Sequence, residues 1–264
     1  MTQEEKRIWL IRRLLAERKD AAGVEIPEDI QGQKDLLRGL MNIRMPDPID
    51  DEFLKIQDEY LTEENLAEGV VKIEDLTPIK ADERLYIWQG DMSRLAIDAV
   101  TLPANSGFTG CYQWLHSCLD NILGSKAGIE LRLFTNEIIT KQGYPEPTGQ
   151  AKITPGFNLP SKYIIHTVGP IVQGRLTKEN ERMLVSCYRS ILELADQNDI
   201  KTLALCCIST GVFMFPNQKA AEIAVETVRK WLDETGSEMK VIFNVFKDID
   251  LMFYKYYLGE TKEE

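Results

Sequence analysis

The stretch KTLALCCISTGVFMFPNQKAAEIAVETVRKWLDE, residues 201–234, decides the fold of this chain. Its first ten residues form an apolar run with β-branched side chains, which predicts a buried strand. A Ser/Thr-Gly loop follows at 209–216, and the segment Gln218–Glu234 is typical of a helix. The loop is not a Walker motif, because no lysine follows its glycine. It can still cradle a phosphate between the strand and the helix.

The same succession of strand and helix recurs from about residue 84 onward. Further strands are predicted at RLYIWQGD (84–91), IDAVTLPAN (97–105), KYIIHTVGP (162–170) and MKVIFNVF (239–246). Further helices are predicted at Cys118–Gly128, Glu179–Gln197 and Ile249–Tyr257. Strands that alternate with helices of this length predict an α/β sandwich around a central, mostly parallel sheet. We assign this domain to residues 83–264.

Residues 1–82 are predicted to form a helical N-terminal extension. Short helices are indicated at 2–19, 35–41, 52–60 and 63–68. Pro46 and Pro48 interrupt them, and Asp50 or Asp51 is able to cap the next one. The extension contains no histidine, cysteine or glycine-rich loop. We therefore interpret it as a packing or lid element rather than a separate binding module.

Composition restricts the kinds of partner. The net charge of −11 comes without a basic stripe, which argues against nucleic acid as a partner. It does not exclude a small anion, because backbone N–H groups can hold a pyrophosphate without lysine. The N-terminal residues are charged and amphipathic, with neither a signal peptide nor a membrane span. A cytoplasmic location away from membranes is the expectation.

Three of the seven cysteines and histidines lie within eight positions, in GCYQWLHSCLDN (110–121). Thiolate and imidazole are the ligands that Zn²⁺ prefers, and Cys111, His116 and Cys118 would leave a fourth coordination position open, as catalytic zinc sites do. The sequence therefore predicts one zinc ion per chain; the alternative is a reduced pocket without metal. The remaining cysteines, Cys187, Cys206 and Cys207, are predicted to pack in the core.

Four segments follow predicted strands, where ligands of α/β sheets bind: Gln89–Met92, Asn105–Cys118, Ser209–Pro216 and Asn244–Asp250. In this order and spacing they resemble the macrodomain family over residues 84–258. The GCYQWLHSCLDN segment is similar to that of the zinc-containing macrodomains of bacteria and some fungi, whose N-terminal extension is also helical. The resemblance implies a three-layer α/β/α fold with a mixed, mostly parallel sheet.

The resemblance also implies how ADP-ribose is bound. Asp91 would accept a hydrogen bond from the adenine amino group, Met92 would donate from its backbone, and Phe246 would stack on the ring. Asn105 would contact the distal ribose, with Phe215 packed nearby. The diphosphate would be wrapped by the loop that begins at Ser209, through the N–H groups of Thr210, Gly211, Val212 and Phe213. His166 is interpreted as a core or near-site histidine, and Asp120 or Asn121 as a helix cap in preference to a support for the metal ligands.

The function implied is zinc-dependent hydrolysis that removes ADP-ribose from modified protein side chains, with Asn105 and His116 as the catalytic candidates. The metal would polarise the distal ribose or activate a water. Two alternatives stay open. One is a non-catalytic ADP-ribose reader, favoured by Leu102, which stands where the family usually has the first asparagine of Asn-Ala-Ala-Asn. The other is an O-acetyl-ADP-ribose deacetylase. The resemblance further points to a lipoylated carrier protein as a candidate modified substrate.

Overall fold

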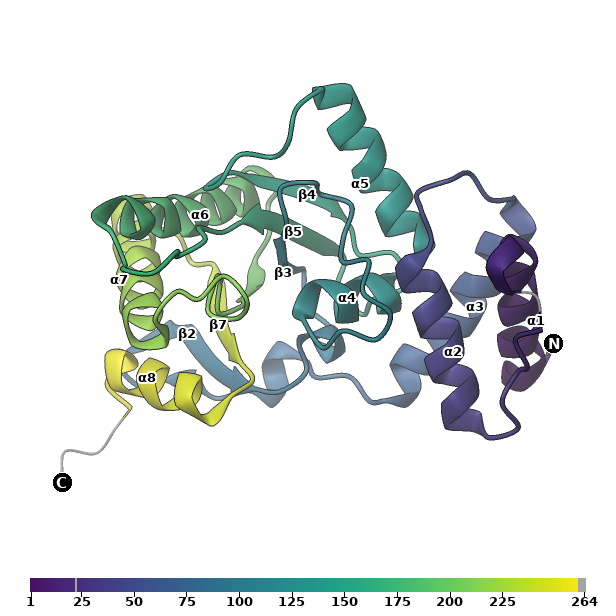
Figure 1. Ribbon diagram of the computed structural model, residues 1–264. Helices are drawn as coiled ribbons and strands as arrows, with labels where there is room; N and C mark the ends of the chain where they lie inside the picture. Colours follow the sequence, from purple (N-terminus) through teal and green to yellow (C-terminus); the bar gives the residue numbers. More distant parts are fainter. Residues whose placement is uncertain (22, 261–264) are drawn as a thin grey trace.

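The computed structural model describes residues 1–21 and 23–260 (Figure 1). Its helices are α1 (Gln3–Ala16), α2 (Ile30–Ile43), α3 (Asp51–Ala67), α4 (Leu119–Ala127), α5 (Ile129–Gln142), α6 (Lys178–Gln197), α7 (Asn217–Thr235) and α8 (Asp248–Leu258). Its strands are β1 (Pro78–Ile79), β2 (Asp82–Gln89), β3 (Ala99–Ala104), β4 (Ala151–Pro155), β5 (Tyr163–Val168), β6 (Thr202–Leu205) and β7 (Lys240–Val245).

The strands form one sheet in the order β1-β2-β7-β6-β3-β5-β4. The five central strands pair in parallel, and the two edge strands, β1 and β4, pair antiparallel to their neighbours. The predicted mixed, mostly parallel sheet is confirmed. Because the central strands share one direction, their carboxyl ends all open at the same edge of the sheet, which is where the candidate binding loops lie.

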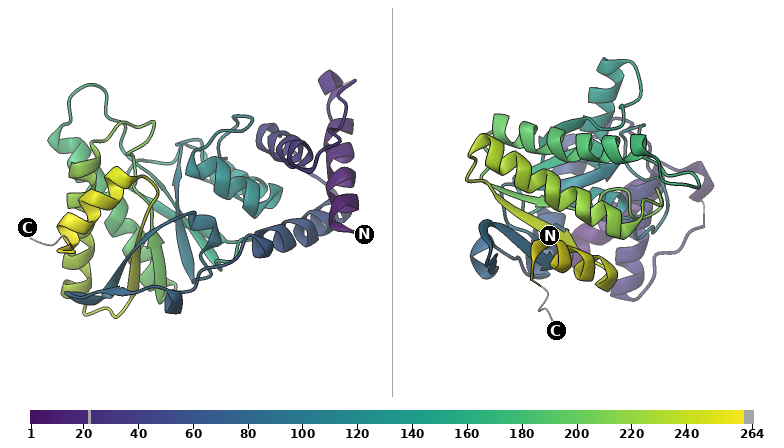
Figure 2. Two further views of the ribbon diagram at one scale, coloured as in Figure 1. Left: turned by 90° about the horizontal axis from the view of Figure 1, so that it is seen from below. Right: turned by 90° about the vertical axis from the view of Figure 1, so that its left-hand side faces the viewer.

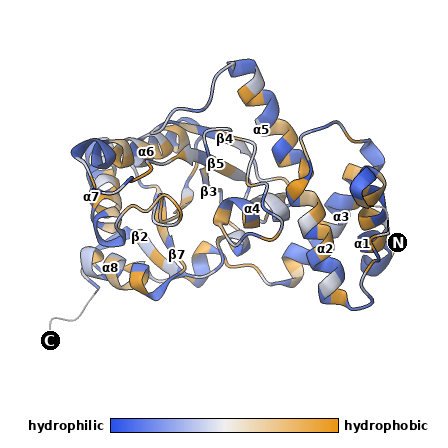
Figure 3. Cartoon of the chain, viewed as in Figure 1, coloured by the Kyte–Doolittle hydropathy of each residue, from blue (hydrophilic) through white to orange (hydrophobic). Residues whose placement is uncertain are grey.

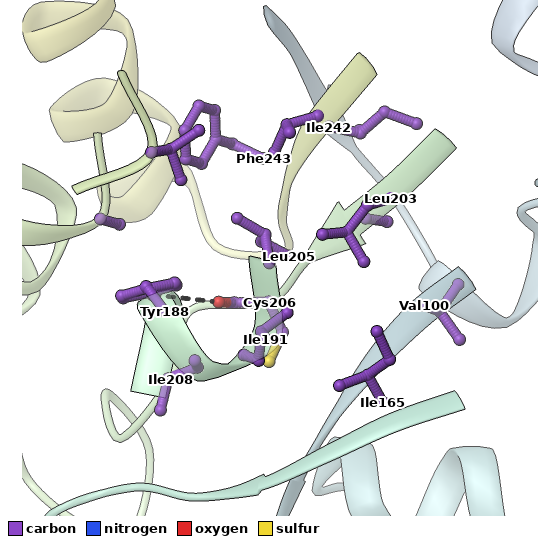
Figure 4. Packing of buried hydrophobic residues seen from close by; sticks show 14 of the residues in the cluster. Val100, Ile165, Tyr188, Ile191, Leu203, Leu205, Cys206, Ile208, Ile242 and Phe243 are labelled. Atoms are coloured by element: carbon purple, nitrogen blue, oxygen red, sulfur yellow. Dashed lines mark hydrogen bonds between the residues drawn. The ribbon is translucent and has the colours of Figure 1, made fainter. Parts of the chain in front are cut away.

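Helices cover both faces of the sheet. Helices α6, α7 and α8 pack side by side on one face, and α4, which leads into α5, lies on the other (Figure 2). The three-layer α/β/α arrangement is therefore confirmed. The strands are apolar on both sides, as expected for a sheet between two helical layers. Figure 4 shows Val100, Ile165, Leu203 and Ile242 on neighbouring strands, and Tyr188 of α6 beside Cys206, to whose carbonyl its hydroxyl donates.

The N-terminal extension has a hydrophobic core of its own. Helices α1, α2 and α3 pack together around Leu10, Leu37 and Phe53, and Ile129 at the start of α5 joins this second cluster. Each helix carries hydrophobic residues beside hydrophilic ones (Figure 3), so one face of each is available for packing. The predicted cap is confirmed, since the Asp50 side chain accepts the N–H of Phe53 at the start of α3.

The structure differs from the sequence-based expectations in four elements. Residues 52–60 and 63–68, predicted as two short helices, form the single helix α3. Helix α5 and strand β4 were not predicted. Strand β1 lies within the segment predicted as a helical extension, but it pairs with β2 and is part of the sheet. The predicted domain boundary after residue 82 stays a prediction. Among the residues that the structure describes, no helix is long and apolar enough to cross a membrane.

Candidate active site

The three predicted metal ligands lie together. The sulfur atoms of Cys111 and Cys118 and a ring nitrogen of His116 all lie within 4.8 Å of one another, and the residues are half-buried. Cys111 Sγ is 3.9 Å from His116 Nδ1. Two sulfur donors and one imidazole nitrogen are a donor set that suits Zn²⁺. The residues present therefore fit the predicted metal.

Cys118 also begins helix α4. It is the N-cap residue, and its sulfur accepts the backbone N–H of Asn121 at 3.4 Å. The N–H of Asn121 lowers the pKa of this thiol, but burial is the larger effect and raises it, so the uncharged thiol is favoured when no metal is bound. The preferred interpretation of Asp120 or Asn121 as the cap was wrong, because both residues lie inside the first turn of α4. Cysteine is an uncommon cap, which is why the sequence pointed to its neighbours.

Asn105 directly follows β3 and shapes the loop that leads to the cysteine–histidine cluster. Its side-chain nitrogen donates to the carbonyl of Gly110 at 3.0 Å, and its own carbonyl accepts the N–H of Phe108. Phe108 has a positive φ of 64° and a buried side chain. Asn105 thus joins β3 to the loop that carries Cys111. Its contact with the distal ribose stays a prediction.

The loop between β6 and α7 is turned back on itself. Phe215 N–H donates to the carbonyl of Ser209, and Met214 N–H donates to that of Gly211. Ser209 and Met214 have φ values of 65° and 58°, an uncommon conformation for side-chain-bearing residues that clusters at functional sites. The Ser209 hydroxyl is buried, and among the residues that the structure describes it has no hydrogen-bond partner. The loop is therefore held in a shape that its own sequence does not favour.

This shape leaves backbone donors free. Within residues 1–21 and 23–260, the N–H groups of Gly211, Val212 and Phe213 donate to no protein acceptor. Consecutive free N–H groups before a helix are suited to bind an anion. Thr210 differs from the prediction, because its N–H already donates to Cys207. Phe215 is 1% exposed and supports the loop from the core.

The residues predicted to bind adenine lie at the ends of two paired strands. Gly90 N–H donates to the carbonyl of Val245, and Gln89 Nε2 donates to the carbonyl of Phe246. These bonds place the turn at Asp91 beside Phe246. The Phe246 side chain is 75% exposed. An aromatic ring this exposed is available to stack on a flat ligand.

Asp91 and Met92 occupy this turn in different ways. One carboxylate oxygen of Asp91 accepts the N–H and the hydroxyl of Ser93, and the other lies 4.0 Å from Lys126 Nζ. The Met92 side chain is buried, so only its backbone faces the turn. The bonds to Ser93 thus fix the orientation of the Asp91 carboxylate, and its second oxygen faces Lys126. Its bond to the adenine amino group stays a prediction.

Leu102 and His166 lie beneath the site. They face each other on β3 and β5, and both are at most 2% exposed. With Phe108, Asp120 and Arg132 they line a partly open cavity. Leu102 is thus a core residue, and His166 is the buried histidine that the sequence predicted. His166 Nε2 lies 2.9 Å from the Thr154 hydroxyl.

Burial of His166 makes stability depend on pH. Burial lowers the pKa of His166 to about 3, against 6.5 for the exposed side chain. Between these values the unfolded chain takes up a proton that the folded protein does not. Above pH 6.5 His166 is neutral in both states and costs no stability. As pH falls from 6.5 toward 3, the free energy of unfolding decreases by roughly 1 kcal/mol per pH unit.

We expect His166→Gln to remove this dependence. Urea unfolding at pH 7 and at pH 4.5 should show a smaller loss of unfolding free energy for the variant than for the unaltered protein. Both proteins carry every other titrating group, so the difference between their slopes isolates the histidine. Parallel losses in the two proteins would contradict a neutral His166.

Several residues of the site carried no sequence signal. Arg38 and Asn42 of α2 and Arg132 of α5 donate hydrogen bonds to the loop that holds the predicted metal ligands. In the sequence each appears as an ordinary polar residue of a helix. Their partners lie between 21 and 78 residues away, so no local pattern could reveal them.

The sequence matches known proteins over almost its whole length. A family model described as the Macro domain matches residues 102–224. A protein-ADP-ribose hydrolase of Treponema medium is 50% identical over 256 residues, which cover 96% of this chain and 98% of that protein. A protein-ADP-ribose hydrolase of Staphylococcus aureus is 49% identical, over 94% of this chain and 92% of that protein.

Solved structures share the fold. The Trypanosoma brucei macrodomain in complex with ADP has a TM-score of 0.67 and 27% identity, and the match covers 84% of this chain and 96% of that one. The same macrodomain in complex with ADP-ribose has a TM-score of 0.65 and 26% identity, over 81% of this chain and 92% of that one.

Proposed function

The chain belongs to the macrodomain family, and on this premise we propose that it is a protein-ADP-ribose hydrolase. Two relatives that bear this name are about half identical to it over nearly their whole length. The substrate would be a protein side chain that carries ADP-ribose, and the product would be free ADP-ribose. The proposal does not depend on the identity of the modified protein.

The observation that carries the proposal is the order of the site along the sheet. The strand order runs β2, β7, β6, β3. The Asp91 turn and Phe246 follow β2 and β7, the free N–H groups follow β6, and Asn105 with the cysteine–histidine cluster follows β3. In ADP-ribose, adenine, diphosphate and distal ribose follow one another in the same order as the residues proposed to bind them follow one another along the sheet. This shared order supports ADP-ribose as the ligand.

The chain's own residues would do most of the binding. Phe246 would stack on adenine with its exposed ring. The N–H groups of Gly211, Val212 and Phe213 would hold the diphosphate beside the N-terminus of α7. Asn105, fixed by its bond to Gly110, would hold the loop over the distal ribose. Bound in this way, the ligand would have the bond to the modified side chain next to the cysteine–histidine cluster.

We infer that Cys111, His116 and Cys118 hold one zinc ion per chain. When bound, such an ion supplies a Lewis acid for the distal ribose or a water of lowered pKa. Burial raises the pKa of the Cys118 thiol to about 12. The cluster would thus release protons when it takes up the ion, which makes metal uptake more favourable at higher pH.

Product analysis tests the proposal. Proteins modified on serine, glutamate or aspartate, and a modified lipoylated carrier protein, are each incubated with the protein, and the released nucleotide is separated by chromatography. We expect free ADP-ribose from at least one of them. Release of acetate from O-acetyl-ADP-ribose, with no ADP-ribose from any protein, would instead favour a deacetylase. Tight ADP-ribose binding without release from any substrate would favour a reader.

A further inference from the structure

The segment that carries the metal ligands has little structure of its own. Residues 111–118, all of which the structure describes, contain no helix and no strand. Tight metal sites need ligands whose positions are fixed before the metal arrives. The parts that fix this segment must therefore lie elsewhere in the chain.

Helix α2 of the N-terminal extension contacts this segment directly. Asn42 Nδ2 donates to the carbonyl of Trp114 at 2.9 Å, and Arg38 Nη2 donates to the carbonyl of His116 at 2.8 Å. Asn42 is 3% exposed. One of these carbonyls belongs to a metal ligand itself, so α2 restrains the backbone from which the His116 imidazole extends.

Asn121 connects α2 to a second ligand. Its side-chain oxygen accepts hydrogen bonds from Arg38 at 2.7 Å and from Asn42 at 2.8 Å. Its side-chain nitrogen donates to the carbonyl of Gln113, and its backbone N–H donates to the sulfur of Cys118. The two donors from α2 thus fix the residue whose N–H faces the Cys118 sulfur.

Packing reinforces these bonds. The Trp114 ring lies against α2 at Gly39, where a Cβ atom would overlap the ring. At the end of α2, Arg132 donates to the carbonyls of Asn42 and Arg44 at 2.7 and 2.6 Å. The same guanidinium donates to the carbonyls of Thr109 and Cys111. Both ends of the ligand segment are therefore joined to one helix.

We propose that Asn42 and Arg38 are positioning residues for the metal, acting through Asn121 and the backbone of residues 113–116. The extension would then be part of the metal site rather than a cover over it. This inference rests on the zinc site proposed above. Supporting residues around metal ligands commonly change metal affinity by about 10–100-fold when they are replaced.

The chain offers a matched control in Asn65 of α3. It is also a buried asparagine of the extension, at 5% exposed, and its side-chain nitrogen also makes two bonds to the rest of the protein. Its acceptors are the carbonyls of Lys126 and Asn158, away from the ligand segment. Asn65→Ala should therefore weaken the attachment of the extension without disturbing the metal ligands.

The experiment titrates the full-length, metal-free protein with Co²⁺ against a competing chelator and follows the visible absorption of the bound ion. We expect Asn42→Ala to weaken Co²⁺ affinity by about 10–100-fold and to alter the absorption spectrum. Asn65→Ala should stay within about threefold of the unaltered protein. ADP-ribose affinity should be unchanged in both variants. Arg38→Ala, at a partly buried position, should behave like Asn42→Ala, and Arg38→Lys should recover part of the affinity.

Two results would overturn the inference, and they differ. Equal Co²⁺ affinity and spectra in Asn42→Ala, Arg38→Ala and Asn65→Ala would show that α2 does not position the metal, while the zinc site itself would stand. An unaltered protein that binds no Co²⁺ but releases ADP-ribose would remove the zinc site and this inference together. The proposed hydrolase activity would survive both results.

Discussion

His116→Ala is expected to lower the rate of ADP-ribose release by on the order of 10²–10³-fold, the usual effect of losing one electrostatic group at the reacting bond. Affinity for ADP-ribose should change by less than about threefold. The reason is that the residue proposed for catalysis and the residues proposed for ligand binding follow different strands of the sheet. His116 follows β3, whereas the contacts proposed for adenine and diphosphate follow β2, β7 and β6.

The rate is measured with a modified protein substrate at saturation, and affinity by calorimetry with ADP-ribose. Leu115→Ala is the control, because Leu115 lies in the same segment, is exposed and offers no metal ligand. It should leave both quantities close to those of the unaltered protein. A His116→Ala variant that releases ADP-ribose at the normal rate would exclude this histidine from the reaction. Equal losses of rate and affinity would instead place His116 in ligand binding.

Phe246→Ala should weaken ADP-ribose binding by about 1–3 kcal/mol, the range found when an aromatic residue that stacks on a base is removed. The melting temperature should hardly change, because the side chain is 75% exposed and its removal opens no cavity. Loss of affinity without loss of stability distinguishes a ligand-binding aromatic residue from one that packs in the core.

Calorimetry with ADP-ribose and with ribose 5-phosphate separates the two ends of the ligand. The variant should lose affinity for ADP-ribose and keep whatever affinity it has for ribose 5-phosphate, which carries no base. Tyr256→Ala, another exposed aromatic residue, on α8, should leave ADP-ribose affinity unchanged. If Phe246→Ala and Tyr256→Ala bind ADP-ribose equally well, Phe246 does not stack on adenine.

The central strands were predictable because each is a short run rich in apolar residues that ends in a turn or loop. In the segment 201–234, helix α7 begins and ends within one residue of the expected limits, whereas strand β6 ends at Leu205, five residues before the end of the predicted strand. The missed elements lack such a signal. Only Ile129, Leu131 and Thr135 of α5 are buried, so its sequence shows little periodicity. Strand β4 is a five-residue edge strand that ends in Pro155.

The site was predictable where one short segment carries the chemistry. Cys111, His116 and Cys118 lie within eight residues, and the loop after β6 is continuous. Contacts between distant segments could not be predicted. Asn42 looks like any polar residue on a helix, and its buried position follows only from the docking of α2 on α4. The sequence predicts that the N–H of Thr210 binds the diphosphate. It does not show that this N–H already donates to the carbonyl of Cys207 within the turn.

The bonds from α2 and Arg132 to the ligand segment determine how much of this protein can be transplanted. Residues 110–121 resemble a self-contained unit, since they hold all three of the proposed metal ligands. Grafted onto a macrodomain without helix α2, that unit would bring the donor atoms but not the partners of the carbonyls of Trp114 and His116. The smallest unit that could be transferred is therefore residues 110–121 together with α2 and Arg132. These three parts are separate in sequence and would have to be transferred together.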